Sequence, residues 1–251
     1  MSYQQNQTMM SDLRLHGMSS RYEVMQTDPA MEDLCFDERL SMLIDAEVHD
    51  RGQRKMQRLL RAAKLKYPTA YLENIDYKAS RGIEKKAISN LQTCQWVRRH
   101  QHLILTGPTG VGKTWLACAF GQAAIRMGMP VLYWRFPRLL EALEIARLDG
   151  SLVNLRARIA KCSLLIVDDW AICPITMNGR QDVFELFEDK VETGSLLIAS
   201  QLPVTEWHGY IAEPTIADAM IDRVVHRSHM LAVHGESMRK LKSNLEEVNN
   251  V

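Results

Sequence analysis

The chain has 251 residues, of which 46% are hydrophobic and 24% are charged, and its formal net charge is +1. This composition is sufficient to bury a substantial core, and it predicts one globular domain with a smaller appendage. No apolar run approaches the length of a membrane span, and the polar start of the chain lacks the pattern of a signal peptide, so we expect neither a membrane protein nor a secreted one.

Cysteine usage points to a reducing compartment. The five cysteines show no C-x-x-C spacing and mostly stand in apolar contexts: Cys35, Cys94, Cys118, Cys162 and Cys173. We expect them to be reduced core residues of a cytoplasmic protein.

The charge of the N-terminal part changes sign abruptly near residue 50. Acidic residues dominate between residues 28 and 50, whereas every charged residue from 51 to 66 is basic. The apolar spacing predicts helix on both sides of this change. Five basic residues recur at intervals that place them on one helix face, here called the basic stripe: Arg51, Arg54, Lys55, Arg58 and Arg61. The stripe suits the backbone of DNA, and the alternative is a solvated helix face that opposes the acidic helix before it.

A domain boundary is expected after this helical region. Proline disfavours helical geometry at the preceding residue, so Tyr67-Pro68 is expected to end the helix. We therefore predict an N-terminal helical domain over residues 1–66 that binds DNA or a partner, a linker over 67–82, and a larger domain over 83–251.

A phosphate-binding motif follows the first predicted strand, residues 102–106. It reads Gly107-Pro108-Thr109-Gly110-Val111-Gly112-Lys113-Thr114, a complete G-x-x-x-x-G-K-T sequence, and a helix follows at once. The glycines let backbone N–H groups face a triphosphate, Lys113 can reach the outer phosphates, and the Thr114 hydroxyl can ligate Mg²⁺. The helix N-terminus adds partial positive charge. The motif predicts a nucleotide-binding site, since a simple tight turn would give Lys113 and Thr114 no role.

A pair of acids supplies the second part of such a site. The continuous apolar run over residues 164–167 is typical of a strand buried on both faces of a parallel sheet, and it ends in Asp168-Asp169. We assign Asp168 to the Mg²⁺ ion, through water, and Asp169 to orienting or deprotonating the attacking water. The alternative is a pair of acids that caps a strand and opens a turn.

Strands and helices alternate through the rest of the chain. Further strands are predicted over residues 131–134, 195–200 and 229–233, with helices over 180–193 and 215–226. This alternation predicts an α/β fold of the P-loop NTPase class, with a five-stranded parallel sheet between helices and the ligand at the carboxyl ends of the strands.

Five segments in this order resemble the IstB family of transposition helper ATPases: GPTGVGKT, LLIVDDW, IASQLP, IADAMIDRVVHR and HGESMRK. The segments RLHGM and FDERLSMLIDAE extend the resemblance over nearly the whole chain. This family is similar to helicase loaders of the DnaC kind and to replication initiator ATPases. The resemblance implies that residues 83–251 form an AAA+ ATPase domain.

The resemblance also implies roles for individual residues. Gln201 stands where the superfamily commonly has an asparagine that senses the γ-phosphate, and it can still offer an amide. Arg223 matches an arginine finger supplied to the neighbouring subunit's nucleotide, and Arg239 matches an arginine that senses nucleotide within its own subunit. Asp169 departs from the more common glutamate and reaches less far, so we expect slow, regulatory hydrolysis.

A helical detour over residues 136–161 separates the second and third predicted strands. It carries several basic residues, with Arg156 and Arg158 among them. The resemblance implies that an extra helix at this point lines a path for nucleic acid. The alternative is that these arginines pair with Glu141, Glu144 and neighbouring subunits.

The expected function is that of a cytoplasmic, ATP- and Mg²⁺-dependent ATPase without membrane contact. It would assemble as a homo-oligomer with ATP at subunit interfaces, bind double-stranded DNA, and stimulate the transposase of the same mobile element. Two alternatives stay open: a helicase loader that acts on single-stranded DNA in replication, and a nucleotide-gated protein adaptor without direct DNA contact. Salt-dependent retention on duplex and single-stranded DNA separates the three.

Overall fold

The computed structural model describes residues 2–31, 33–77 and 82–238. Its internal contacts divide the chain into two compact units, residues 1–58 and 59–251. Within the described residues, none of the helices combines the length and the apolar character of a bilayer-spanning segment.

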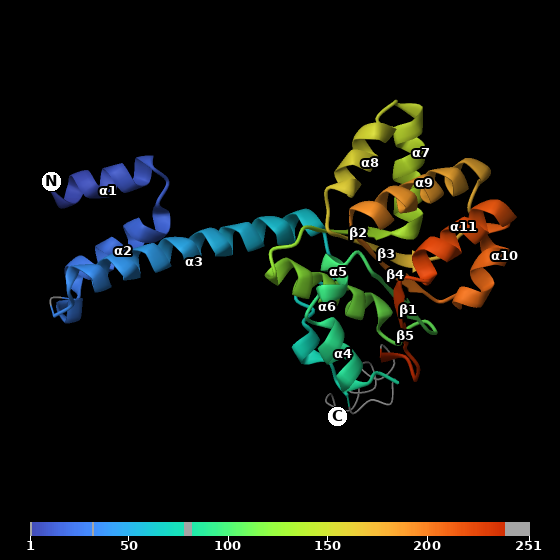
Figure 1. The fold of residues 1–251 in the computed structure, drawn as a ribbon, viewed down its shortest axis with the longest axis horizontal. Coiled ribbons are helices and arrows are strands. Elements are labelled where there is room, and N and C mark those ends of the chain that lie inside the picture. Colours follow the sequence, from blue (N-terminus) through green and yellow to red (C-terminus); the bar gives the residue numbers. More distant parts are fainter. Residues whose placement is uncertain (1, 32, 78–81, 239–251) are drawn as a thin grey trace, which may run out of the picture. The chain divides into compact units, whose positions relative to one another are not determined.

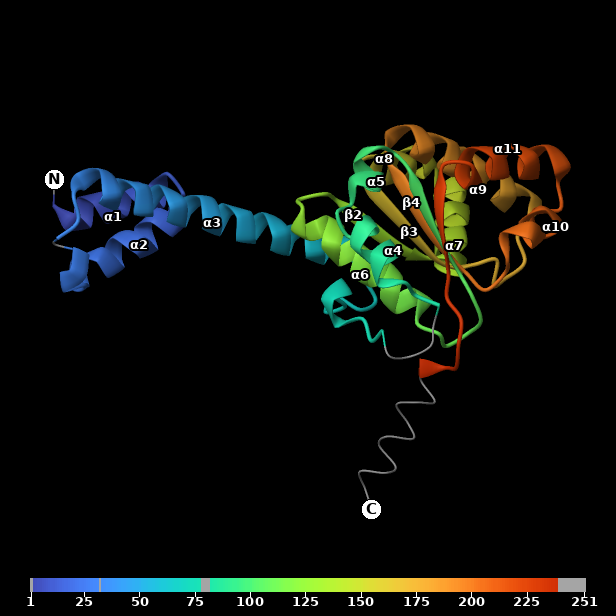
Figure 2. The ribbon, with the colours of Figure 1, turned by 60° about the horizontal axis from the view of Figure 1, so that its bottom comes forward.

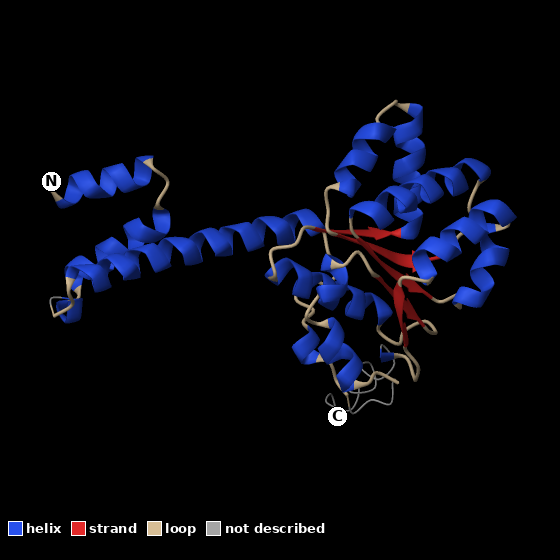
Figure 3. Cartoon of the chain, viewed as in Figure 1, coloured by secondary structure: helices blue, strands red, loops and turns tan. Residues whose placement is uncertain are grey.

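The larger unit is built on a parallel sheet of five strands in the order β2-β3-β4-β1-β5, drawn in red in Figure 3. The strands are β1 (His102–Thr106), β2 (Val131–Arg135), β3 (Leu164–Trp170), β4 (Ser195–Ser200) and β5 (Ser228–Ala232). The three inner strands, β3, β4 and β1, are almost wholly buried, whereas the edge strands β2 and β5 are only partly buried. This difference explains why the inner strands read as continuous apolar runs.

Helices cover both faces of the sheet. They are α4 (Lys85–Leu91), α5 (Gln95–Arg98), α6 (Lys113–Arg126), α7 (Phe136–Leu148), α8 (Leu152–Ala160), α9 (Met177–Thr193), α10 (Trp207–Ile211) and α11 (Pro214–Val225). Figures 1 and 2 show α6, with α4 and α5, on one side of the sheet and α7, α9 and α11 on the other. The predicted five-stranded parallel sheet between helices is confirmed. Because the strands are parallel, the end of β1 that leads into the phosphate loop lies at the same edge of the sheet as the part of β3 that contains Asp168.

Two local predictions differ from the structure. The detour predicted over residues 136–161 consists of two helices, α7 and α8, because Gly150 adopts a positive φ of 76° in the turn between them. Cys35 is exposed, so its predicted place in the core is wrong, whereas Cys94, Cys118 and Cys162 are buried. All five cysteines are free thiols.

The segment after residue 63 packs on the outer side of α6. A short 3-10 helix, η2 (Leu72–Asn74), lies in it, and Leu72 is buried. The side chain of Gln122 donates to the carbonyl of Pro68, and Arg126 pairs with Glu73. Part of the region predicted as a linker is therefore attached to the helix that begins at the phosphate loop.

The N-terminal unit contains α1 (Tyr3–Asp12), α2 (His16–Thr27), the short 3-10 helix η1 (Pro29–Met31) and most of α3 (Phe36–Ala63). The acidic and basic stretches of the sequence share the single helix α3, so the change of sign near residue 50 is not a break in structure. The rings of Tyr3 and Tyr22 stack between α1 and α2 with centroids 5.4 Å apart.

One buried carboxylate joins α2 to α3. Glu47 accepts the backbone N–H groups of Gly17 and Met18 at 2.9 and 3.2 Å, and its second oxygen accepts Nε of Arg51 at 2.6 Å. A Cβ on Gly17 would lie 2.4 Å from the carbonyl oxygen of Ala46, so this close approach of the helices requires glycine. Glu47 thus caps α2 from another helix.

Replacing this cap is expected to loosen the N-terminal unit. Burial opposes the charge of Glu47, but hydrogen bonds from Arg51, Met18 and Gly17 outweigh burial and hold its pKa below the usual 4.5. The cap therefore stabilises the fold above the pKa of the unfolded chain, and its contribution is lost as pH falls through the folded-state pKa. Glu47→Gln should cost about 1–2 kcal/mol at neutral pH, because a neutral amide binds these donors less strongly.

Hydrogen exchange of residues 16–27, corrected for intrinsic rates, measures this effect at pH 7 and over a series of falling pH values. The variant should exchange faster at pH 7, and its difference from the unmodified chain should shrink as pH falls through the folded-state pKa of Glu47. Glu23→Gln, on the exposed side of α2, is the control and should not change the exchange at any of these pH values. Equal protection of Glu47→Gln and the unmodified chain at pH 7 would show that the cap contributes nothing.

Candidate nucleotide-binding site

The phosphate loop lies between the end of β1 and the start of α6. Gly107 and Gly110 have positive φ values of 147° and 85°. A Cβ on Gly107 would lie 2.0 Å from the carbonyl oxygen of Val233, and one on Gly110 would lie 2.3 Å from Oγ of Ser237. Both positions therefore require glycine for space as well as for backbone conformation. The loop follows a strand, turns at glycines and leads into a helix, which is the arrangement that a triphosphate-binding loop requires.

Lys113 is folded into the loop at the first position of α6. Its ammonium group donates to the carbonyl oxygens of Gly107 and Pro108 at 2.7 and 2.8 Å, and the residue is only 9% exposed. Burial lowers the pKa of Lys113, while the charges of Asp168 and Asp169 act in the opposite direction. An anion placed beside this ammonium group would offset its cost of burial, which makes Lys113 a suitable phosphate ligand.

Asp168 lies directly beside the loop at the end of β3. Its Oδ1 accepts the hydroxyl of Thr114 at 3.1 Å, and its Oδ2 accepts the hydroxyl of Tyr133 at 2.7 Å. Burial raises the pKa of Asp168, and the two donated hydrogen bonds only partly compensate. Burial and the neighbouring carboxylate raise the pKa of Tyr133, so its hydroxyl stays protonated and donates. The structure thus brings the predicted metal residues Thr114 and Asp168 together.

Asp169 forms an ion pair with Arg135 on β2. The pairing of β3 with β4 shifts register between Val167 and Trp170, and both Asp169 and Ala171 have a positive φ near 60°, of 57° and 62°. Asp169 Oδ2 lies 2.9 Å from Nε and 2.8 Å from Nη2 of Arg135. This ion pair holds the carboxylate against β2.

Gln201 and Arg239 follow the ends of β4 and β5. Thr106 pairs with Ser200 in the sheet, so Gln201 stands one residue beyond this pair, near the start of the loop, and its side chain is exposed. Arg239 lies outside the described residues. The residue before it, Met238, donates its backbone N–H to the carbonyl of Gly110 at 3.0 Å, so the chain reaches the loop at this point.

Arg223 lies on the last turn of α11 and does not join its own chain's loop. Its guanidinium pairs with Glu188 and stands 5.9 Å from the ring centroid of Phe184, both on α9. The side chain is 47% exposed.

The predicted DNA-contact residues fall into two groups. Some of them form ion pairs with acids: Arg51 with Glu47, Arg54 with Asp50, and Arg156 with both Glu185 and Asp189. The others are exposed and have no ion-pair partner among the described residues: Lys55, Arg58, Arg61 and Arg158.

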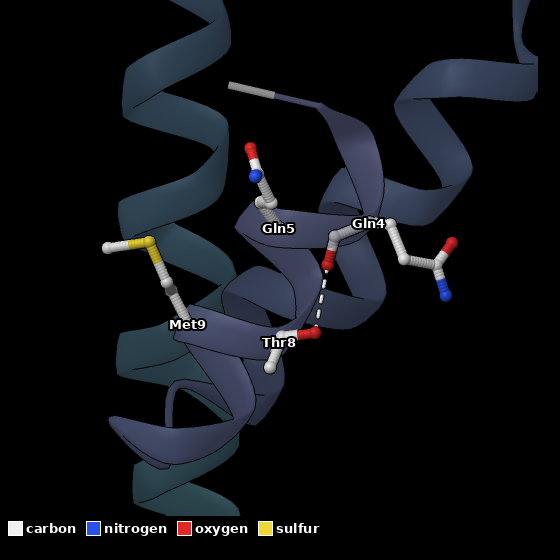
Figure 4. Close-up of a pocket in the computed structure, with 4 residues that line it drawn as sticks. All are labelled: Gln4, Gln5, Thr8 and Met9. Atoms are coloured by element: carbon white, nitrogen blue, oxygen red, sulfur yellow. Dashed lines mark hydrogen bonds between the residues drawn. The ribbon is translucent and has the colours of Figure 1, made fainter.

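A shallow hollow on α1 offers no comparable chemistry. It is lined by Gln4, Gln5, Thr8 and Met9, and the Thr8 hydroxyl donates to the carbonyl of Gln4 at 3.0 Å (Figure 4). These four side chains carry no charge for a phosphate or a metal ion.

Two residues of the site were not predicted in these roles. Tyr133 and Arg135 occupy alternate positions of β2, and they bind Asp168 and Asp169 respectively. A tyrosine and an arginine at the end of an otherwise apolar strand were only a weak indication that this strand contributes to the site. Their partners depend on β2 lying next to β3, which the sequence pattern does not reveal.

Comparison with known sequences places this geometry in a family. The model of the IstB-like ATP-binding protein family matches residues 8–246. A protein of Sinorhizobium fredii, named for ATP binding in an insertion sequence, is 39% identical over 231 residues, which cover 92% of this chain and 94% of the relative. A protein of the insertion sequence IS1162 from Pseudomonas fluorescens, also named for ATP binding, is 43% identical over 203 residues, which cover 81% and 88%.

Solved structures share the fold at low sequence identity. The DnaC helicase loader has a TM-score of 0.55 at 14% identity, with 67% of this chain and 98% of that chain covered. A DnaA replication initiator bound to AMPPCP and single-stranded DNA has a TM-score of 0.56 at 18% identity; 74% of this chain is covered, and the match spans only 57% of the DnaA chain. The larger unit therefore shares the fold of these two replication proteins, and by its match over residues 8–246 the chain belongs to the IstB-like ATP-binding protein family.

Proposed function

We propose that this protein binds Mg²⁺-ATP and acts as an accessory ATPase of DNA transposition. The observation that carries the proposal is the convergence of the loop and Asp168, with the Thr114 hydroxyl 3.1 Å from Oδ1 of Asp168. Residues 107–114 would hold the phosphates through backbone N–H groups and Lys113, and Arg239 would sense the nucleotide.

The donor set fits a magnesium ion. Asp168 is 1% exposed, and the side chains that bind it are two neutral hydroxyls, with no cationic side chain bonded to it among the described residues. A buried carboxylate in this state gains from a divalent cation, and hydroxyl and carboxylate oxygens are the ligands Mg²⁺ prefers. Thr114 would bind the ion directly and Asp168 through water. A metal held there would supply positive charge that offsets the charge of the phosphates.

Hydrolysis is proposed to be slow in the isolated chain. Asp169 would orient or deprotonate the attacking water and Gln201 would contact the γ-phosphate or the water, but Arg135 holds Asp169 in an ion pair. Slow turnover suits a switch whose assembled state must persist until a partner arrives.

Removing Arg135 is therefore expected to accelerate basal hydrolysis. Arg135→Gln should raise kcat about five- to tenfold with little change in KM, because the freed carboxylate can turn to the attacking water. The measurement is steady-state phosphate release at saturating ATP. Arg138→Gln is the matched control, since Arg138 pairs with Glu141 on α7 and not with Asp169. A kcat at or below that of the unmodified chain would mean that Arg135 does not restrain the base.

Assembly is proposed to place ATP between subunits of a homo-oligomer. Arg223 would serve as an arginine finger that contacts the nucleotide of the neighbouring subunit. This role agrees with its position against α9, away from the phosphate loop of its own chain. The exposed cations without an ion-pair partner among the described residues, Lys55, Arg58, Arg61 and Arg158, are the strongest candidates for contacts with duplex DNA. Arg51, Arg54 and Arg156 would contribute only if they exchanged their acidic partners for phosphate.

The family favours transposition over helicase loading. The relatives that are 39% and 43% identical belong by name to insertion sequences, whereas the likeness to the DnaC helicase loader, at 14% identity, concerns the fold alone. The partner would be the transposase of the same element, and the protein would act in the cytoplasm.

Two binding measurements test the proposal. With ATP and Mg²⁺, the protein should be retained on duplex DNA with a steep salt dependence, and a variant with Lys55, Arg58 and Arg61 all replaced by glutamine should lose about three units of the logarithmic salt slope. The transposase should co-purify with the ATP-bound protein. Preference for single-stranded DNA together with capture of a helicase would support a loader, and capture of a partner without DNA retention at any salt would support an adaptor.

A further inference from the structure

We propose that Tyr133 is the positioning residue that orients the magnesium carboxylate of Asp168. The inference rests on the proposed function, because it assigns to β2 a role in the same Mg²⁺-nucleotide site. It adds a residue from outside the phosphate loop and the paired aspartates.

The two oxygens of Asp168 are divided between two elements. Oδ1 faces Thr114 at the start of α6 and accepts its hydroxyl at 3.1 Å, while Oδ2 faces β2 and accepts the Tyr133 hydroxyl at 2.7 Å. Two donors on different oxygens fix the rotation of a carboxylate about its terminal bond, which is otherwise soft. Oδ1 is thereby presented on the side of the threonine that would ligate the metal, and Oδ2 is occupied on the opposite side.

The backbone around this contact is rigid. Tyr133 pairs with Ile166 in the parallel ladder of β2 and β3, two residues before Asp168, and both Ile166 and Val167 are fully buried. The hydroxyl and the carboxylate are therefore held by neighbouring strands and not by a loop. A group held in this way can orient a ligand without moving when the ion binds.

Phenylalanine would fill the same space without the hydroxyl. The hydroxyl of Tyr133 has Asp168 as its hydrogen-bond partner in the described residues, so its contribution is to this carboxylate. When the donor is removed, Oδ2 loses the side-chain hydrogen bond that holds it toward β2, and the carboxylate can turn away from the metal position. Outer partners of metal ligands typically change metal affinity by 10–100-fold when they are removed.

Tyr133→Phe is therefore expected to raise the Mg²⁺ concentration required for half-maximal nucleotide binding by about tenfold. The probe is a fluorescent, non-hydrolysable ATP analogue, titrated with Mg²⁺ at fixed protein concentration. Binding of the same probe in excess EDTA should be unchanged within about twofold, because the loop and Lys113 are intact; this split between metal-dependent and metal-independent binding would not follow from a general loss of stability.

Tyr210→Phe is the matched control. Its hydroxyl is also part-buried and donates to a protein oxygen, the carbonyl of Cys173 at 2.6 Å, but it does not contact Asp168. Its Mg²⁺ curve should coincide with that of the unmodified chain. Coincident curves for Tyr133→Phe and the unmodified chain would overturn the inference, and so would equal displacement by Tyr210→Phe. If the unmodified chain bound no nucleotide with Mg²⁺, the proposed function itself would fail, which is a distinct result.

Discussion

Lys113→Ala should abolish detectable ATP binding, with a loss of at least about 100-fold in affinity. The ammonium group is the one cation inside the loop, where it lies 2.7 Å from the carbonyl oxygen of Gly107. Two charge-assisted contacts to phosphate oxygens, each contributing about 1.5–3 kcal/mol, account for the expected loss. Alanine also leaves the backbone cradle without the charge that balances the β- and γ-phosphates.

Isothermal titration with ATP and Mg²⁺ measures this loss, and circular dichroism verifies that the variant is folded. Lys86→Ala is the control: it removes an exposed lysine from α4 and should bind ATP normally. The two variants have the same net charge, so a nonspecific electrostatic effect would appear in both. Affinity of Lys113→Ala within threefold of the unmodified chain would contradict the nucleotide site and, with it, the proposed function.

Arg223→Ala should leave ATP binding intact while reducing hydrolysis about 1,000-fold in the assembled protein. Arg223 contacts Glu188 and Phe184 on α9 and has no bond to the loop of its own chain within the described residues. A guanidinium that is exposed and unused by its own site is suited to a neighbour's phosphates. The control, Arg227→Ala, removes another exposed arginine four residues later and should retain full turnover.

A mixing experiment distinguishes a finger in trans from a local structural effect. Lys113→Ala lacks the lysine that binds the phosphates but keeps the proposed arginine finger, and Arg223→Ala lacks the finger but keeps the lysine. In a mixed assembly, an Arg223→Ala subunit can be completed by the finger of a Lys113→Ala neighbour, so hydrolysis should partly recover although each variant alone is inactive. Two inactive variants that stay inactive when mixed, or normal turnover by Arg223→Ala alone, would show that the finger assignment is wrong.

The sheet was predictable because its inner strands carry strong local signals. Residues 164–167 and 196–199 are apolar without interruption because helices cover both faces. Strand β4 coincides with the predicted strand over 195–200, and β3 extends to Trp170, three residues beyond its apolar run. The edge strand β5 is less apolar, since His229 and Met230 are exposed, yet the predicted strand over 229–233 differs from the observed one by one residue at each end. Helix α3 was predicted as two stretches because charge changes sign within it, although charge does not interrupt backbone hydrogen bonding.

For the basic residues, the pattern of charge predicted their place on a helix but not their ion-pair partners. The spacing of the basic stripe placed its members on one helix, but it could not tell which of them already had acidic partners. Arg51 and Arg54 pair with acids one turn earlier on α3, and Arg156 reaches across to α9. Lys55, Arg58 and Arg61 have no such partner among the described residues.

Sequence by itself determined the phosphate-loop motif and the family, and it led to the proposal that Thr114 and Asp168 hold the metal, because each depends on residue types at short, fixed spacings. The tertiary structure alone decided that Tyr133 binds Asp168, that Arg135 holds Asp169, and that Glu47 caps α2. Those contacts join residues 29–35 positions apart, and they form only because strand order and helix packing bring distant segments together. Local sequence propensity does not encode such neighbours. Where the polar group is buried, as in Asp168 and Glu47, the cost of leaving it without a partner makes the contact specific.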